Sequence, residues 1–307
     1  MINLFHINNH IIDTSEYSNL LHGNIVTVFE KSISEYVGSK YAVSFNSATS
    51  AIFLALQNKN ANITIPSIIP PVVLNAIKTS GNVYTFKDDI DWVGDSYVLH
   101  NFGNYKIVDS AQKLEKNQFK KECNPNDLMI FSFYPTKPVG SCDGGVIVSD
   151  DFDKIQHLKE MALNGMSYSD NNWERKIKFP GYKMYMNSIQ CDIALRNFNL
   201  YEYKLKKLKL VKNEYNKEFN LNNTSNHLYR MNVKNRSEFI KNMLENKIAI
   251  GVHYEAAHLN PVYKINNDTY PKSEMDSQTT VSIPYNETLT LSERMHIIDK
   301  VKKYINK

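Results

Sequence analysis

The fold class follows from residues 41–56, which read YAVSFNSATSAIFLAL. The run from Tyr41 to Phe45 is short and apolar, as in a buried strand, and residues 46–49 lead into an apolar helix from Ser50 to Leu56. The same alternation recurs on both sides, with helices expected at 24–36 and 71–78 and strands at 62–65, 83–86, 96–99, 105–108, 127–133 and 146–148. This alternation predicts an α/β fold with a largely parallel central sheet flanked by helices.

The pattern changes after Asp150. One long helix is expected from Ser188 to Glu218, because apolar side chains recur along one face, at Phe198, Tyr201, Leu205 and Leu208. Other elements are expected as helices at 153–163 and 237–245, a strand at 248–254, and a terminal helix from Leu291. We therefore expect a large α/β domain over residues 1–187, in which segment 1–23 is the hardest to place. A smaller C-terminal α+β domain over residues 188–307 would begin with the long helix.

The composition excludes several classes of protein. The chain has 307 residues, 36 of them basic and 32 acidic, so it is not basic enough for nucleic acid to be its main partner. Since no run approaches about 18 apolar residues and the N-terminus lacks a basic region, neither a membrane span nor a signal peptide is expected. Three widely spaced cysteines, Cys123, Cys142 and Cys191, favour a reducing compartment, and we expect a cytoplasmic protein.

Polar groups follow several of the expected strands, at the edge where open α/β sheets bind ligands. In residues 46–49, small side chains let the N–H groups of a helix N-terminus approach an anion. An ordinary helix cap by Ser47 or Thr49 explains the same residues equally well. Farther along, Asp109 directly follows an apolar strand. Its carboxylate either caps the next turn or pairs with a cation, such as a protonated ring nitrogen.

A third segment reads FSFYPTK from Phe131 to Lys137 and precedes the paired glycines Gly144 and Gly145. A lone lysine is usually a solvated surface group. A lysine held between buried strands has a lowered pKa, however, and can form a Schiff base with a carbonyl cofactor. The three segments together supply a phosphate cradle, a carboxylate, the hydroxyl of Ser132 and a lysine, which is the set that a pyridoxal phosphate enzyme needs.

These motifs, in this order, resemble those of the DegT/DnrJ/EryC1/StrS family, the sugar aminotransferases among the fold-type I pyridoxal phosphate enzymes. The resemblance runs from about Thr27 to the C-terminus and is carried by residues 41–51, 108–112, 131–137, 144–145, 252–254 and 282–285. On this pattern Lys137 resembles the Schiff-base lysine, and Asp109 resembles the partner of the ring nitrogen. Gln112 resembles the residue beside the ring hydroxyl. The phosphate binders implied by the resemblance are Ala48, Thr49 and Ser132.

The chain departs from the family pattern in three places. Pro70 stands where an aromatic residue usually stacks on the cofactor ring. The family's Asn-Tyr-Arg motif, which reaches the neighbouring subunit's cofactor phosphate, appears as Lys183-Met184-Tyr185, so Lys183 and Tyr185 are the expected phosphate contacts. The span from Phe86 to Asp109 is shorter than the family's by roughly a helix and a strand. We therefore expect a sheet that lacks a strand and a substrate wall that is partly open.

The resemblance implies an enzyme that carries pyridoxal 5′-phosphate and moves an amino group, from glutamate, onto a keto group of a nucleotide-linked deoxysugar. Such an enzyme would serve surface-polysaccharide or related glycan biosynthesis as a homodimer with shared active sites, and His253 and Tyr254 are its candidate substrate contacts. Two alternatives stay open: a sugar dehydratase, in whose branch histidine replaces the lysine, and a non-catalytic sensor or binding protein. No metal site is expected, because the spacing of His253 and His258 does not fit a zincin.

Overall fold

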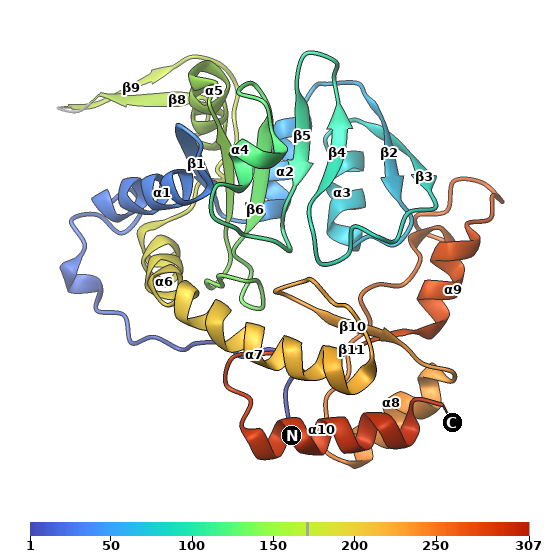
Figure 1. The fold of residues 1–307 in the computed structure, drawn as a ribbon. Helices are drawn as coiled ribbons and strands as arrows, with labels where there is room; N and C mark the ends of the chain where they lie inside the picture. The colour runs from blue at the N-terminus through green and yellow to red at the C-terminus, as the bar shows by residue number, and fades with distance from the viewer. Residues whose placement is uncertain (170–171, 307) are drawn as a thin grey trace.

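The computed structural model describes residues 1–169 and 172–306. A five-stranded sheet with the order β1-β7-β6-β5-β4 lies at its centre (Figure 1). The strands of this sheet are β1 (Tyr41–Phe45), β4 (Tyr97–Asn101), β5 (Lys106–Asp109), β6 (Leu128–Ser132) and β7 (Gly145–Ser149). Next to β4, the parallel pair β2 (Asn62–Pro66) and β3 (Val83–Lys87) extends this layer.

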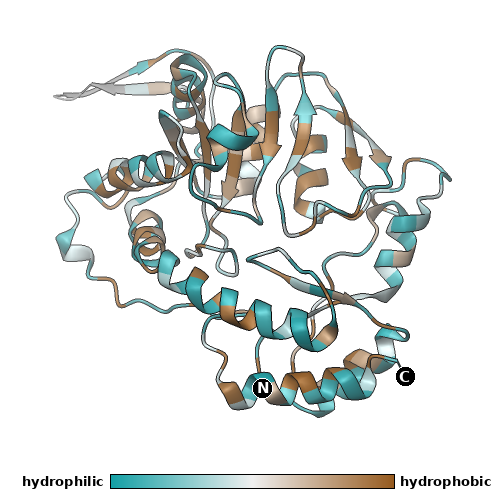
Figure 2. Ribbon diagram, in the orientation of Figure 1, coloured by the Kyte–Doolittle hydropathy of each residue, from teal (hydrophilic) through white to brown (hydrophobic). Residues whose placement is uncertain are grey.

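Helices cover both faces of the sheet, and strand β6 shows how its residues alternate between the two faces. Leu128 and Ile130 pack into one apolar cluster, whereas Met129 and Phe131 pack into the opposite one. The first cluster includes α2 (Ala48–Leu56), α3 (Pro71–Thr79) and α5 (Phe152–Ala162), and the second includes α1 (Asn24–Val37), α4 (Gln118–Glu122) and α6 (Ser188–Asn199). Figure 2 shows the apolar strands between the helical layers. The α/β fold predicted from the sequence is confirmed.

The sheet is mixed rather than largely parallel, which corrects one detail of the prediction. Among its described strands, β5 and β6 run parallel, whereas the pairs β1–β7, β7–β6 and β4–β5 are antiparallel. A parallel neighbour needs a crossover of about a dozen residues or more. Residues 102–105 alone separate β4 from β5, so the chain turns back as a hairpin.

The short span from Phe86 to Asp109, which the structure describes throughout, holds strand β4 and no helix. The strand expected at 96–99 is therefore confirmed as β4, and the span lacks a helical crossover. Because the hairpin reverses β4, Tyr97 at its start lies opposite Asp109 at the end of β5.

The C-terminal third has an apolar cluster of its own. There β10 (Tyr229–Asn232) and β11 (Thr280–Ile283) form an antiparallel pair. This pair packs against α7 (Tyr201–Phe219), α8 (Arg236–Glu245) and α10 (Leu291–Tyr304). The expected domain boundary between residues 187 and 188 coincides with the start of α6 and stays a prediction.

Two of the secondary-structure predictions for this part of the chain are wrong. The long helix at 188–218 is two helices, α6 and α7, which meet at Leu200, where φ −92° and ψ −4° lie away from ideal α-helical values. The expected strand at 248–254 does not form, since its residues pair one at a time, Ile248 with Ile2 and Gly251 with Ser282. The apolar pattern of that segment therefore reflects burial without a continuous strand partner.

The remaining short elements are η1 (Thr14–Glu16), β8 (Met166–Ser169), β9 (Asn172–Ile177), η2 (Ala257–Leu259) and α9 (Pro271–Thr279). None of the helices in the described ranges combines the length and the apolar character that crossing a membrane requires. The cysteines Cys123, Cys142 and Cys191 are all free thiols.

Candidate active site

A pocket of about 370 Å³ opens where three strands end. Because β7 is antiparallel to both of its neighbours, β1, β6 and β5 run in one direction and their carboxyl ends share an edge. The pocket is lined by Ser47, Ala48, Thr49, Ile52, Pro70, Val72, Val73, Trp92, Asp109, Ala111, Gln112, Ser132, Tyr134, Lys137, Asp143 and Tyr254. All three segments that the sequence singled out therefore meet in one place.

The N-terminus of α2 forms one wall of the pocket. Ser47 caps this helix, and its Oγ accepts a hydrogen bond of 3.1 Å from the N–H of Ser50. The N–H groups of Ala48 and Thr49, in the first turn, are out of reach of the helix's own carbonyls. A Cβ at Gly145 would lie 2.6 Å from the backbone of Ala48, so glycine lets this turn pack directly on β7. The wall suits an anion such as a phosphate.

Asp109 ends β5 and is only 3% exposed. Its Oδ1 accepts a hydrogen bond of 2.9 Å from the N–H of Ala111, and its Oδ2 accepts one of 2.8 Å from the hydroxyl of Tyr97. Burial raises the pKa of Asp109, while the two hydrogen bonds and the charge of Lys137 act in the opposite direction. A buried carboxylate held this way can pair with a cationic N–H group in the pocket.

Lys137 lies in the loop between β6 and β7. The turn is closed by a hydrogen bond of 2.9 Å from the backbone N–H of Lys137 to the carbonyl of Tyr134. The side chain reaches the pocket but is largely surrounded by protein, and burial lowers its pKa to about 8 although the Asp109 carboxylate opposes this. At neutral pH a fraction of the molecules therefore carries an uncharged Lys137 amine, the form that a nucleophile or a general base requires.

The far wall joins the short span to the C-terminal part of the chain. The Gln112 amide donates a hydrogen bond of 2.9 Å to the Tyr254 hydroxyl and accepts one of 2.7 Å from the N–H of Gly94. Trp92 is 6% exposed, and its indole N–H donates a hydrogen bond of 3.0 Å to the carbonyl of Ile68. Its ring plane lies within 6° of that of Tyr254. These contacts fix the aromatic side of the pocket.

Most of the predicted site residues line this pocket, namely Ala48, Thr49, Pro70, Asp109, Gln112, Ser132, Lys137 and Tyr254. His253 precedes Tyr254, but its Nδ1 lies 2.9 Å from the Oγ of Ser282, and burial lowers its pKa to about 4. The structure places His253 beside the lining residues rather than among them.

The other two predicted residues lie elsewhere in their own chain. Lys183 is exposed, and its backbone pairs with that of Leu163. Tyr185 pairs with Phe45 through the backbone, and its ring lies 4.5 Å from the ring of His22. Their expected contact with a partner subunit's cofactor stays a prediction.

Three further residues contribute to the site but are not predicted as site residues from the sequence, although one of them, Tyr134, lies in the FSFYPTK segment. Trp92 and Tyr134 line the pocket, and Tyr97, which is not a lining residue, donates a hydrogen bond to Asp109. The signal available for Trp92 and Tyr97 is two aromatic residues in the short span DWVGDSY, whose only other apolar side chain is that of Val93. These aromatic residues can be assigned to the site only once the hairpin is known to place β4 next to β5.

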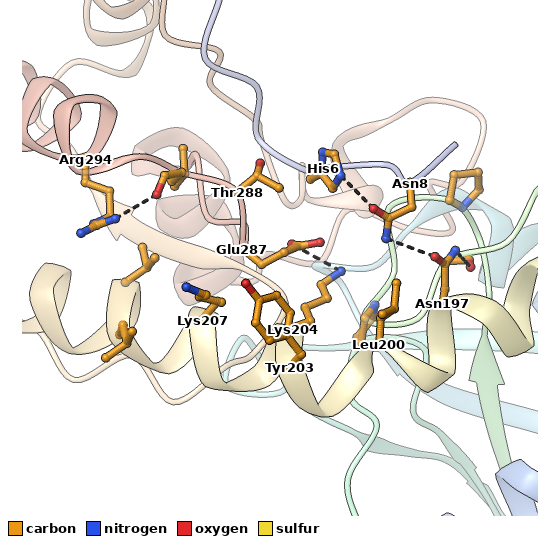
Figure 3. A pocket seen from close by; sticks show the side chains of 16 residues that line it. His6, Asn8, Asn197, Leu200, Tyr203, Lys204, Lys207, Glu287, Thr288 and Arg294 are labelled. Atoms are coloured by element: carbon orange, nitrogen blue, oxygen red, sulfur yellow. Dashed lines mark hydrogen bonds and ion pairs between the residues drawn. The ribbon is translucent and has the colours of Figure 1, made fainter. Parts of the chain in front are cut away.

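A larger cavity, of about 560 Å³, lies between α7 and the segment that leads into α10 (Figure 3). It also holds a lysine whose pKa is lowered by burial, Lys204, and the Nζ of this lysine lies 3.8 Å from Oε2 of Glu287. On its other side, Asn8 donates a hydrogen bond of 3.1 Å to Asn197. Glu287 is the only carboxylate among the described residues that line this cavity, and it already faces Lys204. The described lining therefore holds no further carboxylate that could pair with a cationic group of a ligand.

The residues of the smaller pocket fit pyridoxal phosphate. The first turn of α2 and the hydroxyl of Ser132 suit a phosphate, Asp109 suits a protonated ring nitrogen, and Lys137 suits a carbonyl carbon. A volume of about 370 Å³ lies within the range of roughly 300–1,000 Å³ for small-ligand sites. Among the described residues, no group of three or more His, Cys, Asp and Glu side chains is arranged to hold a metal ion.

Comparisons with known proteins point to the same chemistry. The family model described as the DegT/DnrJ/EryC1/StrS aminotransferase family matches residues 6–93 and 100–302. A relative from Campylobacter jejuni, named UDP-4-amino-4,6-dideoxy-N-acetyl-beta-L-altrosamine transaminase, is 26% identical, and the alignment covers 92% of each chain. That alignment spans 351 positions, more than the 307 residues of this chain.

Two solved structures share the fold across nearly their whole length. The aminotransferase TlmJ from Streptoalloteichus hindustanus superposes with a TM-score of 0.83 at 18% identity, covering 99% of this chain and 98% of that one. PseC of Helicobacter pylori, an aminotransferase involved in the biosynthesis of pseudoaminic acid, gives a TM-score of 0.81 at 19% identity and covers 99% of both chains. Because the family model covers almost the entire sequence, this chain belongs to the DegT/DnrJ/EryC1/StrS aminotransferase family.

Proposed function

We propose that this protein is a pyridoxal phosphate-dependent aminotransferase that moves an amino group from glutamate to a keto group of a nucleotide-linked deoxysugar. The observation that carries the proposal is the meeting of Lys137, Asp109 and the α2 N-terminus in one pocket. Each of these groups alone has an ordinary structural explanation, whereas their convergence at one sheet edge does not.

Three parts of the chain hold the cofactor in this proposal. The N–H groups of Ala48 and Thr49 and the hydroxyl of Ser132 bind its phosphate, because they offer neutral donors and the positive end of a helix. Asp109 retains a proton on the ring nitrogen, since a buried carboxylate favours a cationic partner. When bound, pyridoxal phosphate supplies an electron sink that lets a carbon next to nitrogen lose a proton.

Lys137 moves that proton. Its Nζ has a pKa of about 8, so the amine accepts a proton near neutral pH and can also return it. The neighbouring carboxylate of Asp109 keeps the pKa of Lys137 from falling further. The alternative of a sugar dehydratase is disfavoured, because the resemblance implies that the dehydratase branch has histidine at the position of this lysine.

The nature of the pocket lining supports a nucleotide sugar as the acceptor. A small keto acid bound tightly as the acceptor would need a planar, bidentate clamp of the kind that arginine provides, whereas glutamate, as the donor, would be held more loosely. The residues that line the pocket include no arginine, and the side chains of Arg196, Arg230 and Arg294 pair with acids elsewhere in the chain. The C. jejuni relative is named as a transaminase of a UDP-linked amino sugar, which favours surface-polysaccharide or related glycan biosynthesis as the setting.

We also propose a homodimer in the cytoplasm. Lys183 and Tyr185 lie outside the pocket of their own chain, as residues that serve a neighbouring subunit's cofactor would. Three free cysteines suit a reducing compartment.

A half-reaction tests the proposed function. Purified protein is loaded with pyridoxal phosphate, and glutamate is then added without an acceptor. We expect the visible absorbance to disappear as the amino group moves to the cofactor, with one 2-oxoglutarate released for each site. UDP-linked 4-keto-6-deoxysugars are then screened for restoration of the absorbance. Cofactor binding without any transfer from glutamate would favour the non-catalytic sensor instead.

A further inference from the structure

The hairpin formed by β4 and β5 brings an unexpected residue to the active site. Because β4 runs antiparallel to β5, its first residue, Tyr97, is the cross-strand partner of Asp109. Tyr97 also falls in residues 94–99, the interval that separates the two matched parts of the family model. The contact therefore joins Tyr97, which the family model does not cover, to Asp109, which it does.

The geometry of the pair is well defined on both sides. Tyr97 is 8% exposed, and its hydroxyl donates a hydrogen bond of 2.8 Å to Oδ2 of Asp109. The ring of Tyr97 packs at 4.6 Å against the indole of Trp92, which a hydrogen bond to Ile68 fixes in turn. The other carboxylate oxygen, Oδ1, is held by the N–H of Ala111. With both oxygens held, the carboxylate plane of Asp109 cannot rotate freely.

We propose that Tyr97 is a positioning residue for Asp109, which it keeps ionised and oriented toward a cationic N–H group in the pocket. This inference rests on the proposed function, since it assumes that Asp109 faces the ring nitrogen of pyridoxal phosphate. Hydrogen bonds to a charged acceptor are stronger than those between neutral groups, and they favour the ionised form. Burial raises the pKa of Tyr97 well above its ordinary value, so its hydroxyl keeps the proton that it donates.

The other groups that face Asp109 set the background for a test. The charge of Lys137 favours the ionised carboxylate, and the hydroxyl of Tyr254 is held by the amide of Gln112. Neither group is altered when Tyr97 becomes phenylalanine, a change that removes a single oxygen atom. Tyr84 offers a matched control, because it is similarly buried, at 6% exposure, and its hydroxyl donates a hydrogen bond of 3.2 Å to the carbonyl of Tyr263.

The experiment measures the dissociation constant of pyridoxal phosphate for cofactor-free Tyr97→Phe, Asp109→Asn, the double variant and Tyr84→Phe across a range of pH. We expect Tyr97→Phe to weaken binding about tenfold, as the loss of a hydrogen bond to a charged group implies. The acid limb of the affinity profile should also move to higher pH, because the pKa of Asp109 rises without the donor. Tyr84→Phe should show neither change, and Tyr97→Phe should add little in the Asp109→Asn background.

The outcomes separate this inference from the proposed function. Wild-type affinity and an unshifted profile in Tyr97→Phe, alongside weakened binding in Asp109→Asn, would overturn the role of Tyr97 alone. The role of Tyr97 would also be overturned if Tyr97→Phe weakened cofactor binding equally in the wild-type and Asp109→Asn backgrounds, since the effect would then not pass through Asp109. Failure of the wild-type protein to bind pyridoxal phosphate would overturn both proposals.

Discussion

The pocket around Lys137 and the cavity around Lys204 share an uncommon feature, a largely buried lysine whose pKa burial lowers. The cavity is the larger of the two, at about 560 Å³ against about 370 Å³. Its lysine faces Glu287, whose Oε2 is buried and accepts no hydrogen bond within the part of the chain that the structure describes (Figure 3). In the pocket, by contrast, the carboxylate of Asp109 is held by Tyr97 and an N–H group. The ends of three strands and a helix N-terminus meet in the pocket around Lys137. This convergence distinguishes the pocket from the cavity as a candidate active site better than volume does.

The largest expected effect distinguishes the two lysines directly. Replacing Lys137 with alanine should lower amino transfer by about 10²–10⁴-fold or more, because it removes the group that moves the proton. Borohydride treatment of the wild-type holoenzyme should attach the cofactor to a peptide that contains Lys137, as mass spectrometry would show. Attachment to a peptide that contains Lys204 would reverse the assignment of the two sites.

The next effect compares the two carboxylates. Asp109→Asn should weaken pyridoxal phosphate binding by about 150- to 4,000-fold, since breaking a buried charge pair costs roughly 3–5 kcal/mol. Glu287→Gln should leave the dissociation constant unchanged, because Glu287 lines only the larger cavity. Equilibrium dialysis of the cofactor measures both constants. Similar losses in the two variants would mean that Asp109 acts on overall stability rather than on the cofactor.

A third effect follows from the lowered pKa of Lys137. Burial lowers it to about 8 from an ordinary value of 10.5, so between these values the unfolded chain binds more protons than the folded one. The free energy of unfolding of the cofactor-free protein should therefore rise with pH across this window, by at most about 3 kcal/mol. Screening by solvent at the partly exposed side chain of Lys137 reduces that figure.

The control for this effect is Lys137→Met, which lacks the titrating amine. It should be more stable than the wild type at pH 7, and the difference should shrink toward zero near pH 10.5. Urea unfolding at several pH values measures the difference in the free energy of unfolding between the two proteins. Titrations that both proteins share cancel in this difference. A difference that stays constant with pH would show that Lys137 is not significantly desolvated.

The part of the site that the sequence predicts is the part that local motifs encode. Asp109 is the last residue of β5, and Thr49 and Lys137 lie shortly after the ends of β1 and β6, so the strand–turn pattern alone places all three near one sheet edge. The direction of β4 is different, because it depends on the length of the connection to β5 and not on any residue type. The sequence predicts strands at 96–99 and 105–108 but not their antiparallel pairing, and so it misses Tyr97.

The same reason explains the errors in the C-terminal part. The apolar stripe that predicts one long helix continues across Leu200, because Phe198 at the end of α6 and Tyr201 and Leu205 at the start of α7 pack against the same cluster. The run from Ile248 is buried by single pairings with Ile2 and Ser282 rather than by a neighbouring strand. Periodicity reports burial, and burial alone does not determine which backbone partner lies opposite.

The smallest expected effect concerns the cavity itself. Replacing Lys204 alone would leave Glu287 nearly buried without a counterion, so Lys204→Met should destabilise the protein. The double variant with Lys204→Met and Glu287→Gln removes both charges and should unfold with a free energy within about 1 kcal/mol of the wild-type value. Its turnover and cofactor affinity should stay within about twofold, which is close to the precision of such measurements. Loss of amino transfer in this double variant, with the fold intact, would show that the larger cavity also takes part in the reaction.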